Sequence, residues 1–292
     1  MAKERGRPSR PVNLKRRSVL GGEASKAAAV LEDALAGTVD SRTAAFFDVD
    51  NTIMRGASIF HLARGLHRRK FFSTRAIVGA AYKQAYFRVV GVEDPKHVAE
   101  ARASALAFIQ GHSVTELQDL VEEIFEEGMA HRIWPGTKAL AQQHIDRGER
   151  VWLVTAAPIE IAGVIARRLG LTGALGTVAE QRDGVYTGRL VGQFLHGQAK
   201  ADAVAALAEE QGLDLDECWA YSDSSNDLPM LSLVGHPAAI NPDAKLRRYA
   251  RSQRWPVRDY RTGRKAARAA MMLTGLGGTT AGAIKTLRGR RN

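Results

Sequence analysis

Four aspartates in this 292-residue chain are paired, and each pair follows an apolar run. Asp48 and Asp50 follow one run, and Asp223 and Asp227 follow another far downstream. Both runs have the length and aromatic content of buried strands. Ligand sites in open α/β sheets lie at the carboxyl ends of the strands. We therefore expect the four carboxylates to share one pocket, where their mutual repulsion requires compensating cations.

Two cations suit such a pocket. Mg²⁺ prefers a site of oxygen atoms that also holds a phosphate. Lys200 opens a predicted helix and provides a fixed positive charge, and Thr155 ends a third predicted strand, where its hydroxyl and the next backbone amide are available. Each residue alone has an ordinary explanation as a helix cap, a turn residue or a surface lysine. We interpret their combination at strand and helix junctions as a site for phosphate chemistry.

The elements that must hold these residues alternate between strand and helix. Strand patterns cover residues 43–47, 150–155 and 218–221, and helical patterns cover 160–169, 200–211 and 228–233. This alternation is typical of the α/β class with a mostly parallel sheet. Asp183 and Gly184, placed before the alternating run 185–190, indicate a small hairpin.

A long insertion separates the first two predicted strands. The first strand ends near residue 49 and the next begins near 150, which is far more than the roughly 30 residues of a βαβ unit require. Helical patterns at 58–66, 74–89, 95–109 and 114–127 indicate a helical subdomain inserted in the core. We therefore assign residues 23–53 and 134–244 to the core, 54–133 to the insertion, and 1–22 and 245–292 to basic tails.

Charge is unevenly distributed along the chain. The net charge of +11 combines +6 in residues 1–20 and +13 in 245–292 with −8 between them. The Arg- and Pro-rich residues 1–22 are typical of a disordered segment. The single Cys218 excludes a disulfide scaffold, and no run of eighteen apolar residues indicates a transmembrane helix. Charged residues follow the twin-arginine-like stretch 15–20, so we expect a cytoplasmic protein.

Four motifs carry a family resemblance. They are Asp48-Val49-Asp50-Asn51-Thr52, Leu153-Val154-Thr155, Lys200, and Asp223-Ser224-Ser225-Asn226-Asp227. With these motifs the sequence resembles the haloacid dehalogenase (HAD) superfamily, in its subfamily IB, phosphoserine-phosphatase-like branch, over roughly residues 43–241. The resemblance implies a three-layer, Rossmann-like core in which the helical insertion is a cap domain. It also implies Mg²⁺-dependent hydrolysis of phosphomonoesters through an aspartyl-phosphate.

The same resemblance implies roles for individual residues. Asp48 would be the nucleophile, and Asp50 would be the general acid and then the general base. The metal-binding set would be Asp48, Asp50 (through its backbone carbonyl), Asp223 and Asp227. Substrate and phosphate would contact Thr155, Lys200, Thr52, the amide of Ala156, Asn226 and, as a substrate anchor in the cap, Arg102.

The cap departs from the family pattern at the substrate. Phosphoserine phosphatases carry a glutamate where this chain has Ala57, and residues 51–92 contain no acid while they hold many Lys and Arg. A basic cap favours an anionic ligand. We therefore expect a phosphorylated metabolite with a second anionic group or a lipid phosphate, with phosphoserine as the alternative substrate.

The basic segments leave a rival class of function open, that of a non-catalytic binding protein with a HAD fold. The basic cap and residues 245–292 suit an anionic membrane surface, which would place the protein at the inner face of the membrane. Basic tails also bind nucleic acid without sequence preference. Because the chain has no base-reading motif, we predict no specific nucleic-acid partner.

Overall fold

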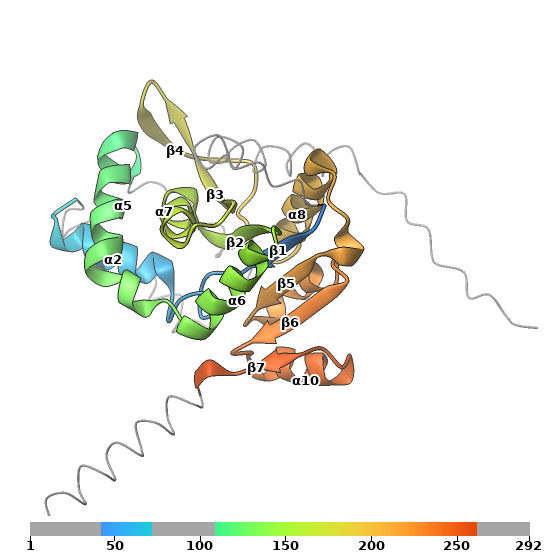
Figure 1. Cartoon of the computed structure of the whole chain (residues 1–292). Helices are drawn as coiled ribbons and strands as arrows, with labels where there is room; N and C mark the ends of the chain where they lie inside the picture. Colours follow the sequence, from blue (N-terminus) through green and yellow to red (C-terminus); the bar gives the residue numbers. More distant parts are fainter. Residues whose placement is uncertain (1–41, 72–108, 262–292) are drawn as a thin grey trace, which may run out of the picture.

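The computed structural model describes residues 42–71 and 109–261 (Figure 1). Their strands form one sheet in the order β4-β3-β2-β1-β5-β6-β7, in which β3 and β4 are antiparallel and all other neighbours are parallel. The strands are β1 (Ala44–Phe47), β2 (Arg150–Pro158), β3 (Gly173–Arg182), β4 (Val185–Val191), β5 (Trp219–Ser222), β6 (His236–Ile240) and β7 (Val257–Arg258).

Helices cover both faces of this sheet (Figure 1). Ala45 and Phe47 of β1 face one buried cluster, and Ala44 and Phe46 face the other. The first cluster includes α2 (Ser58–Arg68), α5 (Val114–Gly128), α6 (Pro135–Asp146) and α7 (Ile159–Leu169). The second includes α8 (Gln198–Gln211), α9 (Leu228–Leu231) and α10 (Ala244–Ser252). The predicted three-layer α/β fold is thereby confirmed.

Several elements match the sequence patterns closely. The predicted arm 185–190 is β4, joined to β3 by Asp183 and Gly184, which both have positive φ. The middle strand was expected to end at Thr155, but β2 continues to Pro158. This extension has a physical reason, because Pro158 still pairs with Thr177 of β3 beyond an irregularity in the register.

The structure moves one predicted boundary. Residues 245–261 fall in the segment assigned to the basic tail, yet they contain most of α10 and all of β7. Leu246 and Ala250 are buried against the sheet, and β7 pairs with β6. Because α10 is rich in Lys and Arg, its two buried apolar residues did not stand out as a helical pattern in the sequence. The fold therefore includes residues 245–261.

The described part of the insertion is helical. Gly65 of α2 packs so closely on Ile124 of α5 that a Cβ there would lie 2.5 Å from its side chain. Arg69 forms ion pairs with Glu123 and Glu127 of α5. This basic side chain therefore pairs with the acidic helix that follows the insertion's basic half.

Other expectations fall outside the described residues. They concern the tail 1–22, most of the helical patterns 74–89 and 95–109, Arg102, and the tail beyond residue 261. The membrane contact through the basic cap and tail rests largely on these segments and stays a prediction. In the described ranges, no helix is both long and apolar enough to cross a membrane.

Candidate active site

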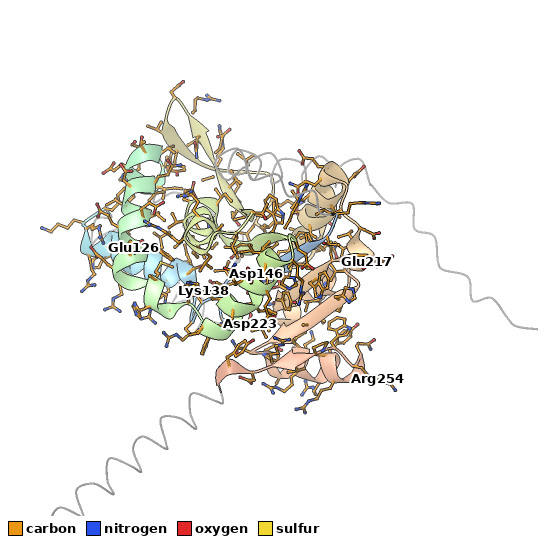
Figure 2. All side chains as sticks on the ribbon, in the orientation of Figure 1. Glu126, Lys138, Asp146, Glu217, Asp223 and Arg254 are labelled. Atoms are coloured by element: carbon orange, nitrogen blue, oxygen red, sulfur yellow. The ribbon has the colours of Figure 1, made fainter. Side chains whose placement is uncertain are left out.

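Three neighbouring strands end at one edge of the sheet. Phe47, the last residue of β1, pairs with Leu153 of β2 and with Tyr221 of β5. Asp48 follows directly, and its backbone N–H donates to the Tyr221 carbonyl at 2.9 Å. Asp223, labelled in Figure 2, follows the end of β5. The parallel register thus places Asp48 between the Thr155 strand and the Asp223 strand, as expected from the sequence.

Lys200 joins the two acidic motifs. Its Nζ lies 2.6 Å from Asp48 Oδ1 and 2.8 Å from Asp227 Oδ2, and only 3% of the side chain is exposed. Gly197 precedes α8 with φ of 58°, and a Cβ there would lie 3.6 Å from the Asn226 carbonyl. The first turn of α8 therefore carries the lysine into the pocket between β1 and the Asp227 turn.

Asp227 accepts a hydrogen bond from a neighbouring side chain in addition to its ion pair with Lys200. Its Oδ2 also accepts a 2.7 Å hydrogen bond from the Ser222 hydroxyl, which is fully buried. The same hydroxyl accepts from the Ser224 N–H at 3.1 Å. One oxygen of Asp227 is thus used by Lys200 and Ser222. This geometry suits a residue that orients the lysine.

The electrostatics of the pocket reflect crowded carboxylates. Burial raises the pKa of Asp48 to about 7, with Asp227 and Asp50 adding to the shift and Lys200 opposing it. Burial likewise raises the pKa of Asp223 to about 7, and the charges of Asp48 and Asp227 add to it. The two carboxylates hold the pKa of Lys200 above its usual value despite burial, so the lysine stays charged.

Asp50 lies in a tight loop that leads to the cap. The N–H groups of Ile53 and Met54 both donate to the Val49 carbonyl at 3.0 Å. Asp50 Oδ1 accepts a 2.8 Å hydrogen bond from the N–H of Ser58, the first residue of α2. Ala57, at the N-cap of α2, supplies no side-chain cap. The Asp50 carboxylate therefore caps the first described helix of the insertion.

The structure also describes the remaining residues that the sequence predicts to contact phosphate. Thr155 is almost fully buried, and its hydroxyl accepts from the Ala157 N–H at 3.1 Å. The Ala156 carbonyl accepts from the Thr177 hydroxyl at 2.8 Å. Thr52 is fully buried, and its hydroxyl has no hydrogen-bond partner in the part of the chain that the structure describes. Asn226 is exposed on the short turn Ser225–Asp227.

The donor set fits a hard cation. No group of three or more His, Cys, Asp or Glu side chains in the described residues forms a ready metal site. Asp48 and Asp223 are nevertheless two carboxylates within electrostatic reach of each other, and both have raised pKa values. Mg²⁺ is bound in proteins by one or two carboxylates together with other oxygen atoms and water. A divalent cation between them would favour the ionised form of both carboxylates and so oppose the effect of burial, which raises both pKa values.

Sequence reasoning missed several polar residues beside the site. Asn241 is fully buried with φ of 48°, and its Nδ2 donates to the Asn51 carbonyl at 2.8 Å. Asp243 caps α10 through the Leu246 N–H at 2.7 Å and also accepts from the Ser225 N–H at 2.7 Å. The run Asn241-Pro242-Asp243 was a visible turn and helix-cap signal. It gave no indication that these side chains reach the loops of the two acidic motifs.

A buried polar network underlies the strands. His144 of α6 lies with Nε2 2.8 Å from the Tyr221 hydroxyl, and its Nδ1 contacts Glu149. Phe47 stacks on Tyr221 with ring centroids 4.4 Å apart. Burial lowers the pKa of His144, although Glu149 opposes this shift. The helix α6, which the sequence patterns did not predict, thus supports the strands that carry Asp48 and Asp223.

The chain is similar to known proteins over most of its length. A family model described as haloacid dehalogenase-like hydrolase matches residues 45–232. Phosphoserine phosphatase SerB1 of Mycobacterium tuberculosis is 54% identical over 253 residues, which are 87% of this chain and 82% of that protein.

Solved structures show the same fold. A protein with unknown function from Bordetella pertussis superposes with a TM-score of 0.67 at 29% identity, over 75% of this chain and 99% of that one. A phospho-aspartyl intermediate analogue of phosphoserine phosphatase has a TM-score of 0.50 at 18% identity, over 76% and 97% of the two chains. At that identity the second likeness concerns the fold alone.

Proposed function

The chain belongs to the haloacid dehalogenase-like hydrolases, and from this premise we propose that it hydrolyses phosphomonoesters through an aspartyl-phosphate on Asp48 with Mg²⁺ as cofactor. The observation that carries the proposal is the buried Lys200 ammonium, which contacts both Asp48 and Asp227 at the end of β1. A lysine there favours the anionic form of Asp48 against the effect of burial, and it also offers positive charge to a phosphoryl group. These are the two requirements for attack by one anion on another.

The first chemical step uses Asp48 and Asp50. An Asp48 carboxylate oxygen attacks phosphorus, the bond from phosphorus to the ester oxygen breaks, and the departing oxygen takes a proton from Asp50. Thr155, the Ala156 amide and Lys200 bind the phosphoryl oxygens, on which the charge of the transition state is spread. Thr52 has a buried hydroxyl without a partner in the described residues, so it is available to the same group.

The second step regenerates the enzyme. Asp50, now ionised, removes a proton from a water molecule, whose oxygen attacks phosphorus. The bond from Asp48 to phosphorus breaks, and inorganic phosphate leaves. Asp50 is suited to both steps because it lies two residues from Asp48 and is held by the Ser58 N–H.

The metal would be held by Asp48, Asp223 and the backbone carbonyl of Asp50. When bound, Mg²⁺ supplies charge neutralisation between the nucleophile and the phosphate. We assign Asp227 to orienting Lys200, since its Oδ2 is already used by Lys200 and Ser222. We assign Asn226 to the substrate side of the pocket, since it is exposed and its carbonyl lies beside Gly197.

The substrate is a phosphorylated small molecule, and phosphoserine is the first candidate because a relative of 54% identity carries that name. One observation favours a second candidate with another anionic group. Ala57 occupies the N-cap of α2, where the resemblance leads us to expect a glutamate for the ammonium of phosphoserine. No acidic residue lies between Asp50 and Glu93 to replace it.

A substrate panel tests the proposal. Phosphate release is measured from phosphoserine, from phosphorylated carboxylates and from a lysophosphatidate, with Mg²⁺ and with chelator. Selective, Mg²⁺-dependent turnover of phosphoserine identifies the first candidate, and turnover of phosphorylated carboxylates that lack an ammonium group identifies the second. Absence of Mg²⁺-dependent release from every member contradicts the proposed activity and favours a binding role.

A further inference from the structure

The loop after β6 touches both acidic motifs. Asn241 Nδ2 donates to the Asn51 carbonyl at 2.8 Å, one residue after Asp50. The Asp243 N–H donates to the Asp223 carbonyl at 2.8 Å, and Asp243 Oδ2 accepts from the Ser225 N–H. The loop 241–243 therefore holds the backbones on both sides of the pocket that we assign to Mg²⁺.

Asn241 also binds the C-terminal end of the described fold. Its Oδ1 accepts from the Tyr260 N–H at 2.8 Å, and its own N–H donates to the Arg258 carbonyl at 2.8 Å. The Tyr260 ring packs on Gly136 of α6 so closely that a Cβ there would lie 2.3 Å from it. Arg261 donates to the Pro242 carbonyl at 3.0 Å. The segment 257–261 is thus fixed against the loop at several points.

Asn51 connects the loop 241–243 to the start of the cap. It has φ of 59°, and its Oδ1 accepts from the Gly56 N–H at 3.1 Å in the loop that enters α2. On the other side of the pocket, the Asp243 N–H holds the Asp223 carbonyl at 2.8 Å. A shift of the loop 241–243 would therefore move the Asn51 backbone, the start of the cap and the Asp223 backbone together.

We propose that Asn241 is a positioning residue for the metal-binding edge of the site. By holding the Asn51 carbonyl and the Tyr260 N–H at once, it makes the C-terminal segment 257–261 part of the frame that fixes Asn51 and Asp223. The inference rests on the proposed function for the identity of the metal. Removal of a group that orients a metal ligand lowers the metal affinity by about 10- to 100-fold.

Two substitutions separate positioning from simple stability. Asn241→Gly tolerates the left-handed backbone and removes both side-chain hydrogen bonds. Asn241→Asp keeps the acceptor for Tyr260 and loses the donor to Asn51. Its added negative charge would strengthen Mg²⁺ binding if charge alone mattered, whereas loss of positioning weakens it. Leu171→Ala is the matched control, because it weakens the buried core and lies outside the loop 241–243 and the segment 257–261.

The experiment measures Mg²⁺ binding to the full chain by titration calorimetry, without substrate, beside thermal unfolding of each variant. We expect Mg²⁺ affinity to fall about tenfold or more in both Asn241 variants. Leu171→Ala should have a lower unfolding temperature and the Mg²⁺ affinity of the wild type. Wild-type Mg²⁺ affinity in a folded Asn241→Asp or Asn241→Gly protein overturns the inference. If the wild type is active and the variants bind Mg²⁺ as tightly as it does, the inference about Asn241 is wrong and the proposed function stands. If the wild type releases no phosphate from the substrate panel, the proposed function is wrong.

Discussion

The Lys200 ammonium lies 2.6 Å from Asp48 Oδ1, and both side chains are almost fully buried. The same ammonium contacts Asp227 on its other side. A buried ammonium shared by two carboxylates is costly to disrupt, because removal of one partner leaves buried charge uncompensated. We therefore expect the contact between Lys200 and the two carboxylates to matter both for the stability of the fold and for the proposed phosphatase activity.

Replacement of Lys200 should lower both the stability of the fold and the phosphatase activity. We expect Lys200→Met to lower the free energy of unfolding by about 3–5 kcal/mol and to remove phosphatase activity. Urea unfolding measures the first effect. The double variant Lys200→Met/Asp227→Asn should be less destabilised than the sum of the single changes, because it removes one of the carboxylates left unpaired. A Lys200→Met protein as stable as the wild type would show that the pair is not buried as described.

Mg²⁺ binding should depend on pH. Asp48 and Asp223 each have a pKa of about 7 without metal, so both are partly protonated at neutral pH. Metal ligands must lose their protons, and the apparent Mg²⁺ affinity should therefore rise between about pH 6 and pH 8. Calorimetry at several pH values checks this trend. An affinity independent of pH in that range would contradict the raised pKa values.

The raised pKa values of Asp48 and Asp223 also determine how the stability of the metal-free protein changes with pH. An aspartate in an unfolded chain has a pKa near 3.9, so between about pH 4 and pH 7 the metal-free folded protein binds more protons at these two groups than the unfolded chain does. Their contribution to stability therefore falls as pH rises through that window. Asp223→Asn should reduce this fall in metal-free protein. Parallel stability curves for wild type and variant would argue against it.

The Thr155 hydroxyl should matter more to rate than to folding. We expect Thr155→Val to lower kcat by about 100- to 1,000-fold, as for the loss of one donor to a charged transition state. Thr155→Ser keeps the hydroxyl and should retain most of the activity. Steady-state kinetics with a phosphate monoester compares the two. Equal kcat in Thr155→Val and wild type would remove Thr155 from the phosphate contacts.

The His144 network should act through stability alone. Tyr221→Phe removes the hydroxyl that faces His144 Nε2 and leaves a buried polar atom without that partner. We expect a loss of about 1–3 kcal/mol in the free energy of unfolding. The Mg²⁺ affinity and kcat should stay close to those of the wild type. A large change in kcat without loss of stability would assign this network a part in the chemistry.

The sequence predicted the elements that carry strong local signals. The all-apolar β1 and the short β5 had to be buried, and parallel pairing then required Asp48 and Asp223 to meet. The approach of Lys200 to Asp48 depends on tertiary packing, because 152 residues separate them. The sequence suggested Lys200 as the positive charge of the pocket, because clustered carboxylates require one. Residue spacing could not show which of the carboxylates its ammonium contacts.

Other features had no such signal. Asn241 looks like an ordinary turn residue, and its contacts with Asn51 and Tyr260 connect three distant parts of the chain. The helix α10 carries so many charges that its buried face, with Leu246 and Ala250, was read as part of a basic tail. Local patterns report periodicity and charge. They do not report which distant backbone groups a side chain will meet.

The covalent step at Asp48 can be trapped in a variant that forms the aspartyl-phosphate but hydrolyses it slowly. Asp50→Asn removes the base for the water attack, while p-nitrophenolate leaves without needing a proton, so this variant should accumulate phosphorylated enzyme from p-nitrophenyl phosphate. After an acid quench, mass spectrometry of the peptides locates the phosphate. We predict that it lies on Asp48 and is absent from Asp48→Asn, which should also be inactive. Phosphate on another residue, or full turnover by Asp48→Asn, would contradict the mechanism.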